Sequence, residues 1–367
     1  MAILFVDGFD HYQTSDIKYK WDNMDSMDPL DTYFWVDNTS PRTGGQQYMR
    51  LSNRSNGGST TFVGSEIKKL LPVESQTLVT GFAFNIVEFN GNLFELVLKN
   101  ANAQVIVKYR FIKNANFDKF GVQVVDHTDT VIGVTSDAIF DDNVWYYMET
   151  KTSVNNTTGS CQVRINGATH LQIDNIDTDP SNGVHPTVNY IEMVTCTTPA
   201  TAVTTFIDDL YLLNNIGLSN NDFLGDVYIQ AILPNGAGAH SDWSPSSGAN
   251  YECVDDIDID NDVTFVSTTT DNAIDTYEFQ NVTAITGSTI KAVVANIVAK
   301  KDGAAIRHIA PIARLNNLEY EGDNIDLVDS YKLHQHIWEN KPSDGTSWET
   351  TDIDNGQFGV KLTPNTP

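Results

Sequence analysis

Apolar and polar residues alternate with a period of two through about the first two hundred residues of the chain. Side chains of a strand point alternately to the two faces of a sheet, so each alternating run predicts a strand with one buried face. Short strands at this spacing, with turn residues between them, predict an antiparallel sandwich or jelly roll. The clearest runs are residues 77–85, 93–98, 104–110, 120–125 and 144–152.

Two further apolar stretches are expected to form the first and last strands of this sandwich. Residues 1–10 are apolar up to Asp7-Gly8, and residues 205–214 carry Asp208 and Asp209 in their middle. Pairing the first strand with the last would remove exposed sheet edges. We therefore expect the first domain to span residues 1–218.

Turn signals identify one hairpin, while helical patterns are scarce. Asn166-Gly167 lies between two alternating arms and supplies the two positive-φ residues of a tight β-hairpin turn. Only residues 64–71 and 271–277 are expected to form short helical turns.

The second half of the chain predicts another β domain. Polar turn residues at 214–225 indicate a boundary. Alternation resumes after it, in residues 226–233, 263–267, 290–299, 305–314 and 330–338. The expected fold class is therefore all-β, with an N-terminal jelly-roll sandwich followed by a second, smaller β-sandwich at 226–367.

Composition narrows the environment and the partners. The chain of 367 residues has 48 acids and 22 bases, a formal charge of −26 that argues against nucleic-acid or anionic-membrane partners. Cys161, Cys196 and Cys253 are an odd count without CxxC spacing, which fits neither a disulfide framework nor a zinc site. With no secretion signal and no run of about 20 apolar residues, we expect synthesis in the cytoplasm.

The paired acids raise the question of a metal ion. If the first and last strands pair, Asp7, Asp208 and Asp209 could meet at one sheet end and hold calcium through oxygen ligands. The alternative is that they cap turns and blunt an edge. We favour the alternative, because calcium usually takes six or more oxygens, and so expect no cofactor.

Two other clusters are weighed in the same way. The acidic tract 255–262 lacks the glycine and glutamate of a calcium loop, so an exposed acidic strand or loop is expected. His334 and His336 would share one strand face, but structural zinc needs four ligands, and a polar sheet face is favoured.

No catalytic arrangement stands out, and the chain is expected not to be an enzyme. Glycosidases need two carboxylates at a defined separation, whereas Glu149 and Glu192 are each isolated in their strands. No Gly-x-Ser-x-Gly elbow occurs. Trp243 and Trp348 lie in segments rich in Pro, Gly and Ser and are candidates for an interface with a partner. Aromatic content alone does not separate a lectin from an assembly protein.

Several strings along the chain also resemble a known family. They are Phe5 to Tyr12, Val144 to Glu149, Gly159 to Gly167, Ile207 to Leu212, Asn221 to Asp226, Ile232 to Gly236, Asn340 to Trp348 and Gly356 to Val360. In order and spacing they resemble the tailed-bacteriophage virion structural proteins that begin with a concanavalin A-like (laminin G-like) jelly roll.

The resemblance implies a function in a virus particle. It implies a capsid decoration or a head or tail appendage, located in the virion, that binds other virion proteins and associates with copies of itself, for example as a trimer. The alternative is a carbohydrate- or host-receptor-binding module of a phage fibre, which would bind a surface glycan through the loops near Asn90 or Asn155.

Overall fold

A computed structural model describes most of the chain. The described residues are 2–25, 34–39, 41–42, 47–52, 54–55, 62–63, 65–87, 92–114, 119–135, 139–195, 204–283 and 285–364. They form two compact units: unit 1 comprises residues 1–10 and 21–229, and unit 2 comprises residues 11–20 and 230–367. The boundaries expected from the sequence, 1–218 and 226–367, stay a prediction about independently folding domains.

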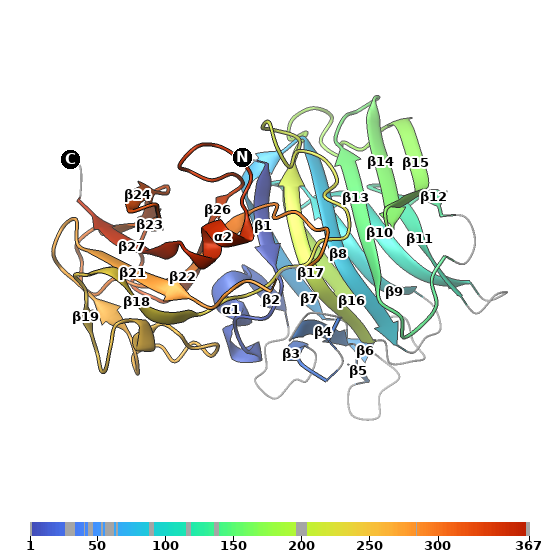
Figure 1. Cartoon of the computed structure of the whole chain (residues 1–367). Helices are drawn as coiled ribbons and strands as arrows, with labels where there is room; N and C mark the ends of the chain where they lie inside the picture. The colour runs from blue at the N-terminus through green and yellow to red at the C-terminus, as the bar shows by residue number, and fades with distance from the viewer. Residues whose placement is uncertain are drawn as a thin grey trace. The chain divides into compact units, whose positions relative to one another are not determined.

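Unit 1 is a sandwich of two antiparallel sheets (Figure 1). Across the first sheet the strands are β15 (Ala168–Ile176), β14 (Gly159–Ile165), β13 (Tyr146–Ser153), β8 (Thr77–Val87), β17 (Thr204–Asn214), β4 (Tyr48–Ser52) and β3 (Phe34–Asp37), and β1 (Ile3–Asp7) also pairs with β17. Across the second they are β12 (Val131–Val134), β11 (Lys119–Asp126), β10 (Val105–Asn114), β9 (Asn92–Lys99), β16 (Val188–Thr195), β7 (Glu66–Ser75) and β2 (Asn23–Asp25). Strands β5 (Arg54–Ser55) and β6 (Phe62–Val63) pair as a short two-stranded sheet.

Phenylalanine rings hold the two sheets of unit 1 together. Phe82 of β8 lies 6.2 Å from Phe94 of β9, and Phe84 lies 5.0 Å from Phe111 of β10, between ring centroids. Even-numbered residues of β8 therefore face the core. Because side chains alternate, the odd-numbered residues of β8, including Asn85, lie on the opposite face of the first sheet, which we call the outer face.

The predicted pairing of the first and last strands is confirmed. β1 runs antiparallel to β17, with Asp7 opposite Leu210. β17 contains a bulge between Asp208 and Tyr211, where Asp209 takes a positive φ of 50°. The bulge lets two consecutive acids sit in a strand that is otherwise apolar.

The predicted hairpin is also confirmed, whereas both predicted helical turns are wrong. Asn166 and Gly167 join β14 to β15 with φ of 48° and 79°. Residues 66–71 belong instead to β7, and residue 64 lies outside the described residues. The pairing of β7 with β16 is interrupted near Pro72, which has no amide proton for the ladder. Residues 271–277 lead into strand β21.

Unit 2 is built on one larger sheet. Its strands are, in order, β18 (Pro234–Ser241), β21 (Ile274–Phe279), β27 (Gln357–Thr363), β23 (His308–Leu315) and β24 (Leu318–Glu321), and β25 (Ile325–Asp326) also pairs with β23. Two ribbons pair β22 (Val293–Ala299) with β26 (Lys332–Trp338) and β19 (Ser244–Pro245) with β20 (Val266–Ser267). The helical elements are η1 (Thr14–Asp16), α1 (Ile17–Lys20), η2 (Tyr251–Cys253) and α2 (Thr350–Asp354).

The ribbon β22–β26 packs on this sheet to form the second core. Trp338 of β26 clusters with Ala313 of β23 and Phe358 of β27, and Val293 and Ala295 of β22 pack against them. The protein is thus all-β, a concanavalin A-like jelly roll followed by a smaller β-sandwich, as the sequence predicts. One detail differs, because residues 226–233 form no strand. The acidic tract 255–262 is a loop, one of the two forms expected for it.

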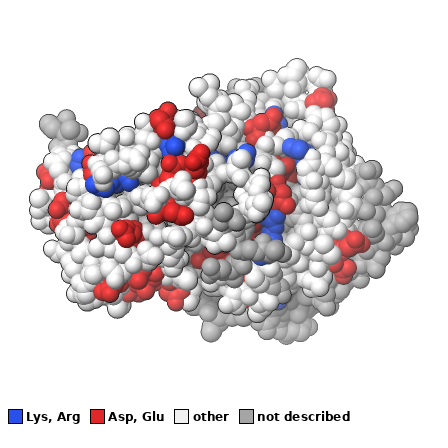
Figure 2. All heavy atoms as spheres, in the orientation of Figure 1, with Lys and Arg blue, Asp and Glu red and all other residues white. Residues whose placement is uncertain are grey.

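The surface is predominantly acidic. Asp and Glu side chains are spread over the visible face among fewer Lys and Arg (Figure 2), consistent with the net charge of −26. No helix in the described part of the chain is long and apolar enough to cross a membrane.

Candidate functional site

A row of side chains crosses five strands on the outer face of the first sheet of unit 1. The pairing registers place Trp35 opposite Arg50, Arg50 opposite Phe206 and Phe206 opposite Asn85. Trp145 immediately precedes β13 and continues the row beside Asn85, because Tyr146 pairs with Phe84. Directly paired residues of antiparallel strands point to the same face, so the row is a property of the register. We call these five residues the aromatic row.

The rings of the row contact one another and a tyrosine beneath them. Tyr48 of β4 is fully buried, and its ring centroid lies 6.0 Å from Trp145 and 4.8 Å from Phe206. The guanidinium of Arg50 lies over the Trp35 ring, 4.2 Å from its centroid. Trp35, Trp145 and Phe206 all stay partly exposed. The row therefore presents ring surface to solvent on a buried aromatic base.

Two polar atoms of the row are buried without a partner. Among the described residues, neither Nε of Arg50 nor Oδ1 of Asn85 has a hydrogen-bond partner. Asn85 is only 3% exposed. A buried polar atom without a partner costs about 1–3 kcal/mol, which natural proteins rarely tolerate without a reason. One donor and one acceptor without partners thus lie beside partly exposed rings. Both atoms are covered in the unliganded chain, so a polar ligand would reach them only after the side chains over them shift.

An aspartate orients the end of the row. Trp35 donates its indole N–H to Asp37 at 3.3 Å, and Arg50 lies 3.7 Å from the same carboxylate. Burial by itself would raise the pKa of Asp37, but hydrogen bonds from Thr39 and Trp35 outweigh it and lower that pKa. Asp37 is therefore a carboxylate at neutral pH and can fix both side chains.

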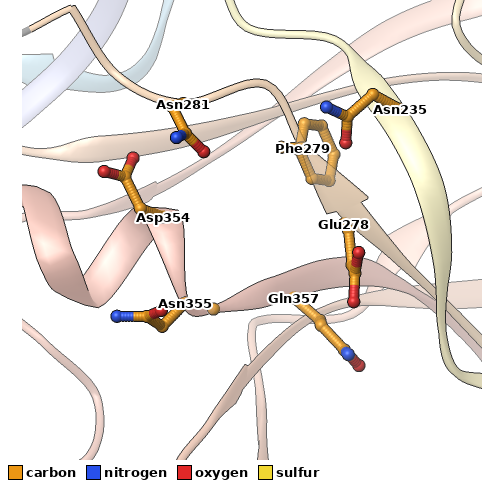
Figure 3. Close-up of a pocket in the computed structure, with 8 residues that line it drawn as sticks. Asn235, Glu278, Phe279, Asn281, Asp354, Asn355 and Gln357 are labelled. Atoms are coloured by element: carbon orange, nitrogen blue, oxygen red, sulfur yellow. The ribbon is translucent and has the colours of Figure 1, made fainter.

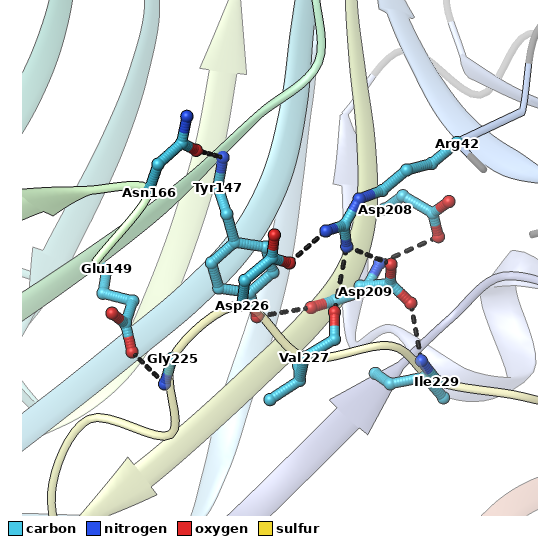
Figure 4. A network of polar contacts seen from close by, with 10 residues as sticks. All are labelled: Arg42, Tyr147, Glu149, Asn166, Asp208, Asp209, Gly225, Asp226, Val227 and Ile229. Carbon is cyan, nitrogen blue, oxygen red and sulfur yellow. Dashed lines mark hydrogen bonds and ion pairs between the residues drawn. The ribbon is translucent and has the colours of Figure 1, made fainter. Parts of the chain in front are cut away.

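Beside the row, the same face carries a network of charged side chains that residues 222–229 cover (Figure 4). Arg42 donates to Asp209 at 2.6 Å and to the carbonyl oxygen of Val227 at 2.9 Å, and it also pairs with Asp226. The backbone N–H of Ile229 donates to Asp209 at 2.7 Å. Residues 222–229 are thereby held across the sheet.

Asp208 and Asp209 differ in how their charge is balanced. Each is only 1% exposed. Burial, followed by the neighbouring charges of Asp209 and Asp10, raises the pKa of Asp208 strongly. Burial also raises the pKa of Asp209, but Arg42 and the Ile229 N–H oppose this, so the rise is smaller. At neutral pH Asp208 is therefore a neutral carboxylic acid.

Glu149 lies at the other end of the charged network. It accepts from the hydroxyl of Tyr211 at 2.6 Å and from the backbone N–H of Gly225 at 2.8 Å. The Tyr211 ring lies directly over Gly81, where any Cβ would overlap it. Glycine at position 81 is thus required for the tyrosine to reach Glu149.

The metal candidates do not form a single cluster. Asp7 accepts from the indole of Trp21 at 2.9 Å and from the N–H of Phe9 at 3.0 Å, while Asp209 is bound to Arg42. No three His, Cys, Asp or Glu side chains converge as metal ligands within the described ranges. Calcium binding through Asp7, Asp208 and Asp209 stays untested.

The two predicted interface tryptophans both lie in the core of unit 2. Trp348 is 3% exposed and donates its indole N–H to the carbonyl oxygen of Trp338. Trp243 is partly buried, donates to the carbonyl oxygen of Ala273 and packs against the cluster of Ile309. Whether either ring also contacts a partner stays a prediction.

The remaining candidates from the sequence are two asparagines, two histidines and a cysteine. Asn155 accepts from the N–H groups of Thr157 and Thr158 and so builds its own turn. Burial lowers the pKa of both His334 and His336. Asn90 and Cys196 lie outside the described residues.

No local pattern in the sequence predicts the aromatic row. Its members come from five separate segments, and only the strand register brings them together. Alternation within each strand indicates which residues share a face, but not which strands are neighbours.

Comparison with known proteins concerns the fold. No family model matches the sequence, and no curated protein matches it. An alginate lyase has a similar structure (TM-score 0.39, 12% identity, 57% of this chain and 95% of that one). A Bacillus licheniformis β-glucanase is also similar (TM-score 0.34, 11% identity, 52% of this chain and 97% of that one). So is lectin II of Ulex europaeus, solved with galactose (TM-score 0.34, 9% identity, 49% of this chain and 89% of that one).

These structures correct one expectation and leave another unsupported. The expectation that the chain is not an enzyme is corrected, because proteins of similar structure include a lyase and a glucanase. At this identity the likeness concerns the fold alone and assigns no activity. None of these structures is described as a virion protein.

Proposed function

We propose that unit 1 binds a carbohydrate on the outer face of its first sheet, through the aromatic row. The observation that carries the proposal is the coincidence of partly exposed rings with unpartnered polar atoms. Three rings, Trp35, Phe206 and Trp145, lie in register with Nε of Arg50 and Oδ1 of Asn85. The proposal rests on this face and not on the fold comparisons.

The chemistry of the row suits a sugar chain. Aromatic rings bind the apolar C–H face of a pyranose, and the free N–H and C=O groups suit its hydroxyls. The row crosses five strands, which at a spacing of about 4.8 Å makes it about 19 Å long. An elongated row favours an oligosaccharide over a single sugar.

The test is a glycan array probed with the full chain, followed by affinity measurement on the strongest ligand. Trp145→Ala and Phe206→Ala should each weaken binding about tenfold, as expected for the loss of about 1.4 kcal/mol of ring contact. Tyr190→Ala is the matched control, since Tyr190 lies on β16 of the second sheet with Lys68 over its ring. An array without ligands, or equal losses in the control, would contradict the proposal.

A virion role is a second proposal, supported by the resemblance of the sequence strings in their order and spacing. It would place the chain in a phage particle, bound to other virion proteins and to copies of itself. Mass spectrometry and electron microscopy of purified particles whose genome encodes this chain test it. Stoichiometric copies on the particle support the role, and absence from the particle removes it.

A further inference from the structure

Unit 2 contains a cavity of about 300 Å³ between three segments of its sandwich (Figure 3). Asn235 comes from the start of β18, and Glu278 from the end of β21 with Asn281 just beyond it. Asp354 ends α2, and Gln357 begins β27. The cavity is at the lower end of the volumes usual for small-molecule sites.

The lining of this cavity is almost entirely polar. Apart from Phe279 and Gly356, each lining residue carries a side-chain amide or carboxylate, and no Lys or Arg lines the cavity. Figure 3 shows the two carboxylates, Asp354 and Glu278, on opposite sides of it.

Hydrogen bonds to the framework position these side chains but do not use up their polar atoms. Oδ1 of Asp354 accepts the N–H of Val282 at 2.9 Å, and Oε1 of Gln357 accepts the N–H of Ala239 at 2.8 Å. Nδ2 of Asn355 donates to the carbonyl oxygen of Thr351. In the part of the chain that the structure describes, the other polar atom of each of these three groups has no protein partner, and neither does the Asn281 amide.

We propose that this cavity binds a neutral sugar, one or two rings in size, by hydrogen bonds to its hydroxyl groups. Each sugar hydroxyl both donates and accepts, which matches the carboxylate acceptors and the amide donors and acceptors of the lining. Two carboxylates, with no Lys or Arg among the described residues of the lining, disfavour phosphate and acidic sugars. The site is separate from the aromatic row and does not depend on it.

Saturation-transfer NMR of the full chain with glucose, galactose, mannose and N-acetylglucosamine tests the proposal. At least one sugar should bind, and the double variant Asn281→Ala/Asn355→Ala should weaken it at least fivefold. Asn324→Ala, an exposed asparagine of unit 2 outside the cavity, is the matched control and should bind as the wild type does. Glucuronate should bind more weakly than glucose.

Variants of the two sites distinguish sugar binding in the cavity from glycan binding at the aromatic row. Binding lost in the cavity variant but kept in Trp145→Ala supports the cavity, whatever the row binds. No binding of any of the four sugars overturns the proposal. Equal binding by the cavity variant and the control, or equal binding of glucuronate, overturns it as well.

Discussion

Two halves of one sheet face in unit 1 differ in what covers them. In the sealed half, residues 222–229 cross the sheet and bury Arg42, Asp209 and Glu149 in a bonded network. In the open half, the aromatic row keeps ring surface exposed and leaves Nε of Arg50 and Oδ1 of Asn85 without partners. The chain itself supplies partners for Arg42, Asp209 and one oxygen of Glu149 in the first half, although Oε2 of Glu149 and Oδ2 of Asp208 accept no hydrogen bond from the described residues. In the second half, we propose, a ligand does so.

This contrast predicts that variants of the two halves have opposite effects. Changes in the sealed half should alter the stability of unit 1 and leave glycan binding intact. Changes in the open half should alter binding and leave stability nearly intact. The reason is that the bonds of the sealed half exist without ligand, whereas those of the open half would form only on binding.

Arg42→Ala should have the largest effect, because it leaves the buried carboxylate of Asp209 without its cation. Loss of one partner of a buried pair costs about 3–5 kcal/mol. Denaturant titration of the full chain measures this loss. Lys108→Ala, which breaks the exposed pair with Asp129, is the control and should cost less than about 1 kcal/mol. Equal effects of the two variants would show that the network does not hold the covering segment.

Asp208→Asn should stabilise unit 1 increasingly as the pH rises. The pKa of Asp208 is raised from 3.8 to about 9 in the folded state. The folded state therefore holds this proton more tightly than the unfolded state, and the stability that the proton contributes is full below the unfolded pKa and is lost as the pH rises towards 9. Asparagine does not ionise, so the stability of the variant relative to the wild type should rise steadily through this pH window. Thermal melting at several pH values measures the difference. Parallel pH profiles for the two proteins would rule out a buried neutral acid.

Trp35→Ala should lower glycan affinity about tenfold, since it removes a ring and frees the Arg50 side chain that lies over it. Because the ring is partly exposed, the free energy of unfolding should change by no more than about 1 kcal/mol. Isothermal titration and denaturant titration of the same preparation measure both effects. A stability loss as large as that of Arg42→Ala would mean that the two halves do not differ.

Asn85→Leu should have the smallest effect on stability and a clear effect on binding. Replacing a buried amide whose oxygen has no partner by an apolar side chain is expected to be neutral or to stabilise by up to about 1 kcal/mol. Affinity for the glycan should fall severalfold because an acceptor is lost. Unchanged affinity would exclude Asn85 from the site.

Much of the fold could be predicted from local pattern. Strands β1, β8 to β11, β13 to β15 and β17 of unit 1 followed from alternation and turn residues, as did the 166–167 hairpin and the pairing of β1 with β17. The strand at residues 66–71 did not, because so short a segment fits a helical turn and a strand equally well. The segment is a strand in the structure because β7 pairs with both β16 and β2.

The sites were harder to predict for the same reason. Asp208 and Asp209 were visible as adjacent acids, but their unequal charge balance depends on Arg42, distant in sequence. Trp243 and Trp348 were visible as tryptophans in loop-like segments, and the structure shows that both rings pack in the core of unit 2.

By itself, the sequence determined which residues alternate, where turns form and how acidic the surface is, because these depend on neighbours along the chain. Apart from the 166–167 hairpin and the pairing of β1 with β17, only the tertiary structure decided which strands lie side by side. That choice placed Trp35, Arg50, Phe206, Asn85 and Trp145 in one row and drew residues 222–229 over the acids beside it. Long-range register is set by the packing of the whole sandwich, and no local pattern encodes it.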